Sequence, residues 1–143
     1  MRVMNERVSV MVPAGTYVLG DPCYVIEGDD WDAVLTNSNY FGNPIGFARG
    51  VAMLGFHTAY GDGCYQGSDG YSYGVDAGLI GLVPLSLAEK HSGFADSDHR
   101  IIEFTNETLC TNENGVMNFG SIRIDTTEEV LYEDDNENVW DDE

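Results

Sequence analysis

The sequence predicts a mostly β protein, an antiparallel sandwich or partly open barrel with one or two short helices and an acidic C-terminal tail. Three observations predict this class. Several short segments alternate in polarity with a period of two, Gly-containing turns separate them, and only one segment has a credible helical pattern. With 143 residues, of which 43% are hydrophobic, the chain can form one domain with its own core.

The first third of the chain predicts two strands and one helix. Valines at alternate positions in 8–12 indicate a half-buried strand, a Pro-Ala-Gly turn follows at 13–15, and 16–19 is a second β-prone run. Apolar residues at helical spacing in 29–35, with acids at the start, predict a short helix. Residues 36–50 are rich in Asn and Gly, which predicts a loop.

The middle of the chain predicts three more strands. Residues 51–60 are apolar on both faces, which is typical of a central strand, and 61–70 form a Gly-rich stretch with two Asp-Gly turn signals. Strands are predicted at 71–76 and 79–83. Residues 84–90 can form one or two helical turns.

The last part of the body predicts a hairpin. Ile102 and Phe104 occupy alternate positions, Asn114 and Gly115 form a turn sequence, and the run 116–124 returns with apolar residues at alternate positions. Seven or so strands are expected altogether.

Charge is the most unusual property of the sequence. There are 25 acidic residues against six basic ones, for a formal net charge of −19. Such a surface repels nucleic-acid phosphates and anionic lipid, so we expect no direct nucleic-acid or membrane binding and a partner protein with a basic surface. No apolar run reaches the ~20 residues of a membrane span and no secretory signal is recognisable, which predicts an intracellular location.

The distribution of acidic residues also predicts a boundary between the folded domain and a C-terminal tail. Residues 126–143 hold nine acids and no Lys or Arg, so we expect a single acidic β-rich domain over 1–125 and a solvated tail over 126–143 that is dispensable for folding. The body alone carries 16 acids and six bases, a net charge of −10, and is acidic in its own right.

Four carboxylates lie in or beside Gly-containing turns, namely Asp21, Asp62, Asp69 and Asp76. Oxygens at such turns can converge on a hard cation, but Asp is also common in turns because it accepts hydrogen bonds from nearby backbone N–H groups. Asp76 lies within an apolar strand region, so we expect it to be buried and hydrogen-bonded, holding the turn at 74–78.

Two other groups of residues are candidates for a ligand site. His57 ends an apolar strand and would be a base or a ligand if Cys23 or Cys64 approached it, whereas a hydrogen-bonded core histidine is the commoner case. Tyr60 lies just before the Gly-rich segment and Tyr65 lies within it, where tyrosines form either a pocket or cross-strand pairs in the core.

Several kinds of chemistry are not expected. His91 and His99 are predicted to face solvent in a polar loop. The three cysteines form no Cys-x-x-Cys pair, and no phosphate-binding loop or nucleophile elbow occurs. No catalytic residue and no cofactor are therefore predicted. The sequence does not decide whether a metal ion binds.

Four blocks carry a resemblance to a known group of proteins: GTYVLGDPCY at 15–24, TAYGDGCY at 58–65, YGVDAGLIG at 73–81 and GSIRIDT at 120–126. Together they resemble small uncharacterised proteins of tailed bacteriophages. The resemblance implies a phage accessory protein in the host cytoplasm and supplies no activity to transfer. Small acidic phage proteins often bind host enzymes, and some imitate the charge of DNA.

Three functions remain open at this point. The first is a non-enzymatic protein that binds a basic surface on a host factor, as a DNA mimic or anti-defence inhibitor, with Asp29, Asp30 and Asp32 around Trp31 as contact candidates. The second is a small-ligand, nucleotide or cation site at the Gly-rich loop, using Asp21, His57, Asp62, Asp76, Tyr60 and Tyr65. The third is a minor virion or assembly component.

Overall fold

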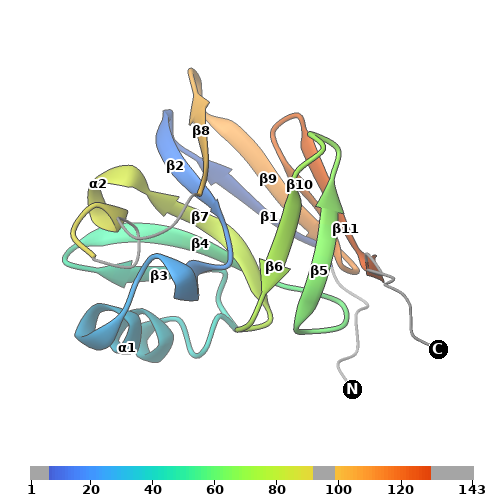
Figure 1. Ribbon diagram of the computed structural model, residues 1–143. Coiled ribbons are helices and arrows are strands. Elements are labelled where there is room, and N and C mark those ends of the chain that lie inside the picture. The colour runs from blue at the N-terminus through green and yellow to red at the C-terminus, as the bar shows by residue number, and fades with distance from the viewer. Residues whose placement is uncertain (1–6, 92–98, 130–143) are drawn as a thin grey trace.

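The computed structural model describes residues 7–91 and 99–129, which form two antiparallel sheets (Figure 1). The first sheet, called sheet A, has the strand order β1 (Arg7–Val12), β9 (Thr108–Glu113), β10 (Val116–Phe119), β11 (Ile122–Glu129), β5 (Gly63–Gly67) and β6 (Ser72–Val75). The second, sheet B, has the order β3 (Ile45–Ala48), β4 (Val51–His57), β7 (Leu79–Pro84), β2 (Gly15–Gly20) and β8 (Arg100–Phe104). The predicted mostly β class is confirmed, in its sandwich form.

Apolar residues form two cores, one on each face of sheet B. The first core lies between the sheets and contains Leu54, Ile80 and Leu82 from sheet B and Met117, Phe119 and Ile124 from sheet A. The second lies under α1 (Gly28–Asn37) and α2 (Leu85–Ala88), which Figure 1 shows on the side of sheet B away from sheet A. Sheet B is therefore apolar on both faces, whereas sheet A has one face open to solvent.

The predicted helix at 29–35 is confirmed as α1. Asp29 and Asp30 lie in its first turn, where carboxylates interact favourably with the helix dipole. Val34 is completely buried against β3. A Cβ on Gly46 would lie 2.7 Å from Cγ1 of Val34, so this glycine permits the close approach of helix and strand. The predicted helical turn after residue 84 is likewise present, as α2.

Two segments predicted as loops or turns contain strands. Residues 36–50 include β3, and the Gly-rich stretch 61–70 includes all of β5. Both strands are short and contain glycine, which obscures the local signal for a strand. Their backbone groups pair with β4 and β6, so tertiary pairing decides their conformation.

The predicted hairpin is wrong in its pairing. Asn114 and Gly115 do form a turn, with φ of +54° and +95°, but they join β9 to β10. A second turn near Gly120 joins β10 to β11, so the predicted run 116–124 is itself a hairpin. The strand with Ile102 is β8 and belongs to sheet B.

The predicted boundary after residue 125 falls inside a strand. β11 continues to Glu129, and Thr126 is completely buried. The Thr126 hydroxyl accepts a hydrogen bond from the Ala59 backbone N–H at 2.9 Å and donates to the Gly115 carbonyl. It thereby links the β4–β5 connection to the β9–β10 turn. Residues 130–143, the rest of the predicted tail, lie outside the described residues.

We therefore expect Thr126→Val to destabilise the fold by about 1–3 kcal/mol, because a side chain of the same shape would leave the partly buried Ala59 N–H without its acceptor and would remove one of the two hydrogen bonds that the Gly115 carbonyl accepts from Thr126. The measurement is the free energy of unfolding from urea titration. The control is Thr127→Val at the exposed neighbouring position, expected to change stability by less than about 0.5 kcal/mol. Equal stabilities of the two variants would contradict this role of Thr126.

Candidate functional site

The carboxylate of Asp21 is a buried acceptor at the end of β2, with only 3% of the residue exposed. One oxygen accepts from the Cys23 backbone N–H at 3.0 Å. The other accepts from the Asp76 and Ala77 backbone N–H groups at 2.6 and 2.7 Å. Three N–H donors compensate the buried charge, and the 3-10 helix η1 (Pro22–Tyr24) is thereby fastened to the β6–β7 connection.

Asp76 is exposed, so the expectation that it is buried was wrong. Burial alternates along β6, with Tyr73 and Val75 inside, and the same alternation turns residue 76 outward. Its carboxylate accepts a hydrogen bond from the Tyr24 hydroxyl at 2.6 Å, which raises the pKa of that phenol. The turn that Asp76 was expected to hold is instead held by Asp21, from another part of the chain.

Asp69 joins the β5–β6 turn to the start of β8. Its Oδ2 accepts from the Tyr73 hydroxyl and from Nε of Arg100, both at 2.8 Å, and its Oδ1 accepts from the Tyr71 backbone N–H at 3.2 Å. Burial alone would raise the pKa of this carboxyl, but the hydrogen bonds from Arg100 and Tyr73 outweigh it and the pKa is lowered. Asp69 therefore stays ionised and has a structural role.

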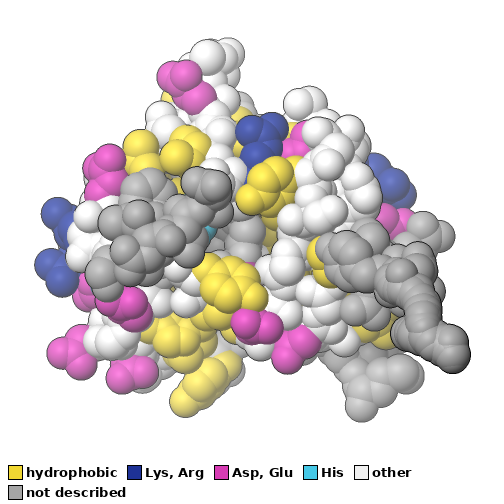
Figure 2. All heavy atoms as spheres, in the orientation of Figure 1, with side chains coloured by type: hydrophobic (Ala, Val, Ile, Leu, Met, Phe, Trp, Pro, Cys, Tyr) yellow, Lys and Arg dark blue, Asp and Glu magenta, His cyan; other side chains and the backbone are white. Residues whose placement is uncertain are grey.

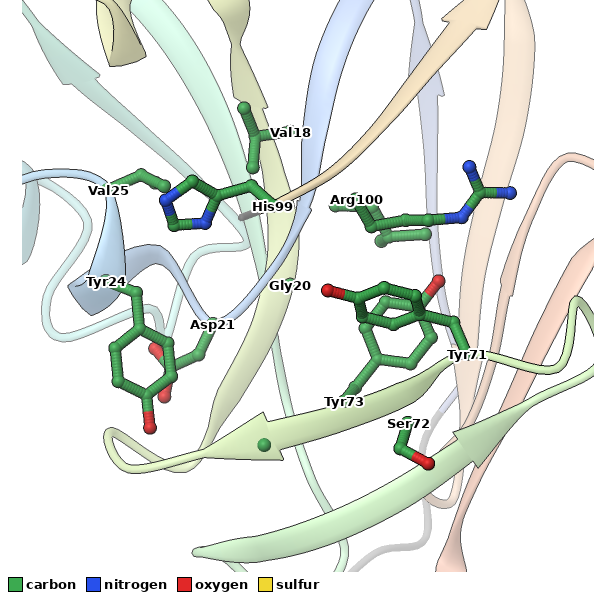
Figure 3. Close-up of a pocket in the computed structure, with 12 residues that line it drawn as sticks. Val18, Gly20, Asp21, Tyr24, Val25, Tyr71, Ser72, Tyr73, His99 and Arg100 are labelled. Carbon is green, nitrogen blue, oxygen red and sulfur yellow. The ribbon is translucent and has the colours of Figure 1, made fainter. Parts of the chain in front are cut away.

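These groups surround a cavity of about 200 Å³ between β6, the end of β2 and the start of β8 (Figure 3). Figure 3 shows Tyr24 and Asp21 on one side, Tyr71 and Tyr73 on the other, and His99 and Arg100 above them. The polar and aromatic lining residues are Asp21, Tyr24, Tyr71, Ser72, Tyr73, His99 and Arg100.

The structure brings only part of the predicted ligand site to this cavity. Asp21 lines it, and Asp76 lies beside it through its bond to Tyr24. His57, Asp62 and Tyr60 are not among the residues that line it. Within 7–91 and 99–129, no group of three or more His, Cys, Asp or Glu side chains is arranged to hold a metal ion.

Two of these predicted residues have other surroundings. Tyr65 is completely buried opposite Tyr73 in the β5–β6 pair, so it belongs to the core. Nε2 of His57 lies 3.2 Å from the Tyr40 carbonyl oxygen.

Sequence reasoning missed the two residues that close the cavity from above. His99 was predicted to face solvent but lines the cavity, and Arg100 was not considered. The residues before β8 carry no motif, and their neighbours are distant in sequence, so no local signal identifies them. His91 was also predicted to face solvent. It is only 8% exposed, and its Nε2 lies 2.9 Å from Oδ2 of Asp30.

The acids predicted to contact a partner have different surroundings on α1. Asp29 and Asp32 are exposed. The Asp30 side chain is only 13% exposed and accepts a hydrogen bond from Nε of Arg49 at 2.6 Å, which lowers its pKa. Trp31 is partly buried and packs against Phe41, with ring centroids 6.4 Å apart. Asp29 and Asp32 are therefore the residues of this group best placed to meet a partner.

Two of the three thiols are held in the protonated form. Burial, followed by the nearby Asp21 carboxylate, raises the pKa of Cys23 to about 12, and burial raises the pKa of Cys110 to about 11. A thiolate is the reactive form of cysteine, so neither residue is suited to act as a nucleophile at neutral pH.

Comparison with known families, curated proteins and solved structures gave no match to this chain. The resemblance to bacteriophage proteins therefore stays a prediction. No helix among the described residues is both long enough and apolar enough to cross a membrane.

We expect Asp21→Ala to destabilise the fold by roughly 2–4 kcal/mol, because three backbone N–H donors would lose a charged acceptor at a buried position. Asp76→Ala is the comparison, expected to cost less than about 1 kcal/mol because that carboxylate is exposed. Urea unfolding of both variants is the measurement. The reverse order of stabilities would contradict the assignment of the turn to Asp21.

We also expect Cys23 to react slowly with iodoacetamide in the folded protein. With its pKa near 12, its thiolate fraction at pH 8 is at least about a hundredfold below that of an ordinary cysteine. The rate should rise as pH increases toward that pKa, since deprotonation supplies the nucleophile. Peptide mapping by mass spectrometry gives the rate, with the urea-unfolded chain as the control. Equal rates in the folded and unfolded chains would contradict the raised pKa.

Proposed function

We propose that this protein is a non-enzymatic binding protein whose acidic surface engages a basic surface of a partner protein. The observation that carries the proposal is the excess of acids, 25 against six bases. The negative electrostatic field of such a protein favours association with positively charged surfaces and disfavours association with phosphates and anionic lipids. The proposal extends to the setting that the sequence resemblance implies, a phage accessory protein acting on a host factor.

Three of the six basic residues are paired with acids of the same chain, and each pair cancels one negative charge that the net charge of −19 already takes into account. Arg49 lies 2.6 Å from Asp30, Arg100 lies 2.8 Å from Asp69, and Arg123 lies 3.8 Å from Asp125. The acids in excess of these pairs carry the net negative charge, and the exposed Asp29 and Asp32 are among them.

The acids are distributed rather than aligned. Figure 2 shows acidic side chains along the lower left of one face, over α1, with further acids at the bottom centre and at the top. Among the residues described on that face they do not form two parallel rows, so this view gives no support to imitation of a DNA duplex. A basic protein surface is the more general match.

The test begins with affinity capture from bacterial extract, followed by kinetics with the purified partner. We expect the association rate to fall at least about tenfold between 0.1 and 1 M salt, because the screening length falls from about 10 to about 3 Å. The double variant Asp29→Asn and Asp32→Asn should lower the association rate about two- to fivefold at low salt.

The matched control removes two exposed charges elsewhere, with Glu103→Gln and Glu113→Gln. If the α1 double variant lowers the association rate more than the control double variant does, α1 is the contact face. Equal falls in the association rate would indicate steering by the charge of the whole molecule. Association that is unchanged at high salt and in both double variants would overturn the proposal.

A second candidate is small-ligand binding, favoured by the cavity of about 200 Å³ with its tyrosine lining. Its occupant would contact Tyr24 and Tyr71 rather than His57, at the end of β4, or Asp62, in the β4–β5 connection. Calorimetric titration with small aromatic and amine compounds is the test. Heats that are unaffected by Tyr24→Ala would exclude the cavity as the site.

A further inference from the structure

A second cavity, of about 450 Å³, lies at the other ends of the two sheets. Its walls come from β1, which is the terminal strand of sheet A on that side, from β3, β4 and β7 of sheet B, and from the connection between β1 and β2. This volume falls in the range of ~300–1,000 Å³ that is typical of small-molecule sites. It is separate from the tyrosine-lined cavity, which lies beside β6 and β8.

The lining of this second cavity is apolar. None of the residues that line it is charged, and Tyr17 is the only one with a polar group on its side chain. The Tyr17 hydroxyl already donates a hydrogen bond to the Pro13 carbonyl at 2.8 Å. Pro13 and Pro84, which also line the cavity, have no backbone N–H to offer. A ligand would therefore be held by apolar contacts and not by a set of hydrogen bonds.

The cavity is an uncovered part of the first core. Leu54 and Leu82 belong to that core and are almost completely buried, whereas Val10 and Ile45 pack against it and are only partly buried. Water beside such side chains finds few hydrogen-bond partners, so its replacement by an apolar group is favourable. Met11 lines the cavity with 52% of the residue exposed, and its flexible thioether side chain can adapt to ligands of different shape.

Charge decides which kind of apolar ligand fits. None of the 25 acids and none of the six bases lines the cavity, so an ionised group placed there would have no partner. The net charge of −19 also repels anions such as the carboxylate of a fatty acid. An uncharged molecule with a hydrocarbon body has neither disadvantage.

We propose that the cavity between β1 and the β3–β4–β7 part of sheet B is a binding site for an uncharged hydrophobic small molecule. The ligand places its hydrocarbon part against Leu54, Leu82 and Ile45 and completes the first core at this end of the sandwich. This site is independent of the proposed function, because it contains no acidic side chain that could meet a basic partner.

The first test uses the full-length protein and two fluorescent probes that differ by one charged group, N-phenyl-1-naphthylamine and its 8-sulfonate. The neutral probe should bind with a rise in fluorescence that does not depend on salt. The sulfonate should bind at least about tenfold more weakly at low salt, because desolvation of its charge and the negative field of the protein both oppose binding.

The second test measures the size of the site by displacing the neutral probe with 1-alkanols from butanol to dodecanol. The affinity of the alkanol should rise about two- to fourfold for each added methylene, as expected when a CH₂ group moves from water to an apolar site. It should stop rising once the chain is longer than the cavity. A rise that continues to the longest chain would indicate adsorption outside a cavity and would overturn the inference.

Three protein variants locate the site. Ala52 lines the cavity, is exposed, and lies two positions before Leu54 on the same face of β4, so Ala52→Phe places a ring in the cavity. This variant should weaken the neutral probe at least about fivefold because the ring takes the space of the ligand. Ala33→Phe, at an exposed position of α1, and Tyr24→Ala, in the tyrosine-lined cavity, should each change the affinity less than about twofold. Circular dichroism and urea unfolding check that each variant folds, and the probe pair and the alkanol series test the site on the unaltered protein.

Several other results would overturn the inference. Equal affinities of the two probes would contradict the preference for an uncharged ligand, and binding that Ala52→Phe leaves unchanged would place the probe elsewhere. Sedimentation velocity tests a second copy as the occupant, which a dimer that Ala52→Phe converts to a monomer would show. Displacement of the neutral probe by the captured basic partner would make that partner the occupant. The salt dependence of partner association tests the proposed function separately, so either can fail while the other stands.

Discussion

The hydrogen bonds of the Asp21 carboxylate join parts of the molecule that the two sheets alone would leave separate. The chain crosses from one sheet to the other four times, and at the β6–β7 crossing the Asp76 and Ala77 N–H groups both donate to this one side chain. The same carboxylate caps η1 through the Cys23 N–H. A single carboxylate therefore fixes the end of β2, the 3-10 helix and the crossing, through three backbone hydrogen bonds.

The cavity follows from this arrangement. Asp21 holds η1 against the β6–β7 crossing, which places Tyr24 opposite Tyr71. Asp69 and Arg100 connect sheet A to sheet B on the same side of the sandwich, without any strand between β6 and β8 among the described residues. The sandwich is thus held together there by side-chain contacts and not by strand pairing.

The acidic residues divide into two groups with different consequences. Asp21, Asp30 and Asp69 accept hydrogen bonds from backbone N–H groups, arginine or histidine, and they stabilise connections between elements. Asp29 and Asp32 are exposed, so their charges interact with molecules that approach the surface. Neutralising the first group should impair folding and neutralising the second should impair encounter, so a net charge by itself does not identify the functional acids.

The sequence by itself determined the class of fold, because alternating valines in β1, the helical spacing in α1 and the Asn-Gly turn at 114–115 are local patterns with local causes. It also determined the negative charge on which the proposed function rests. It did not determine β3 and β5, whose glycine-containing segments become strands only by pairing. Nor did it determine the site. Asp21 and Asp76 lie 55 positions apart, and only tertiary structure decided which of the two carboxylates is buried, because burial depends on what packs over a residue and not on its neighbours in the chain.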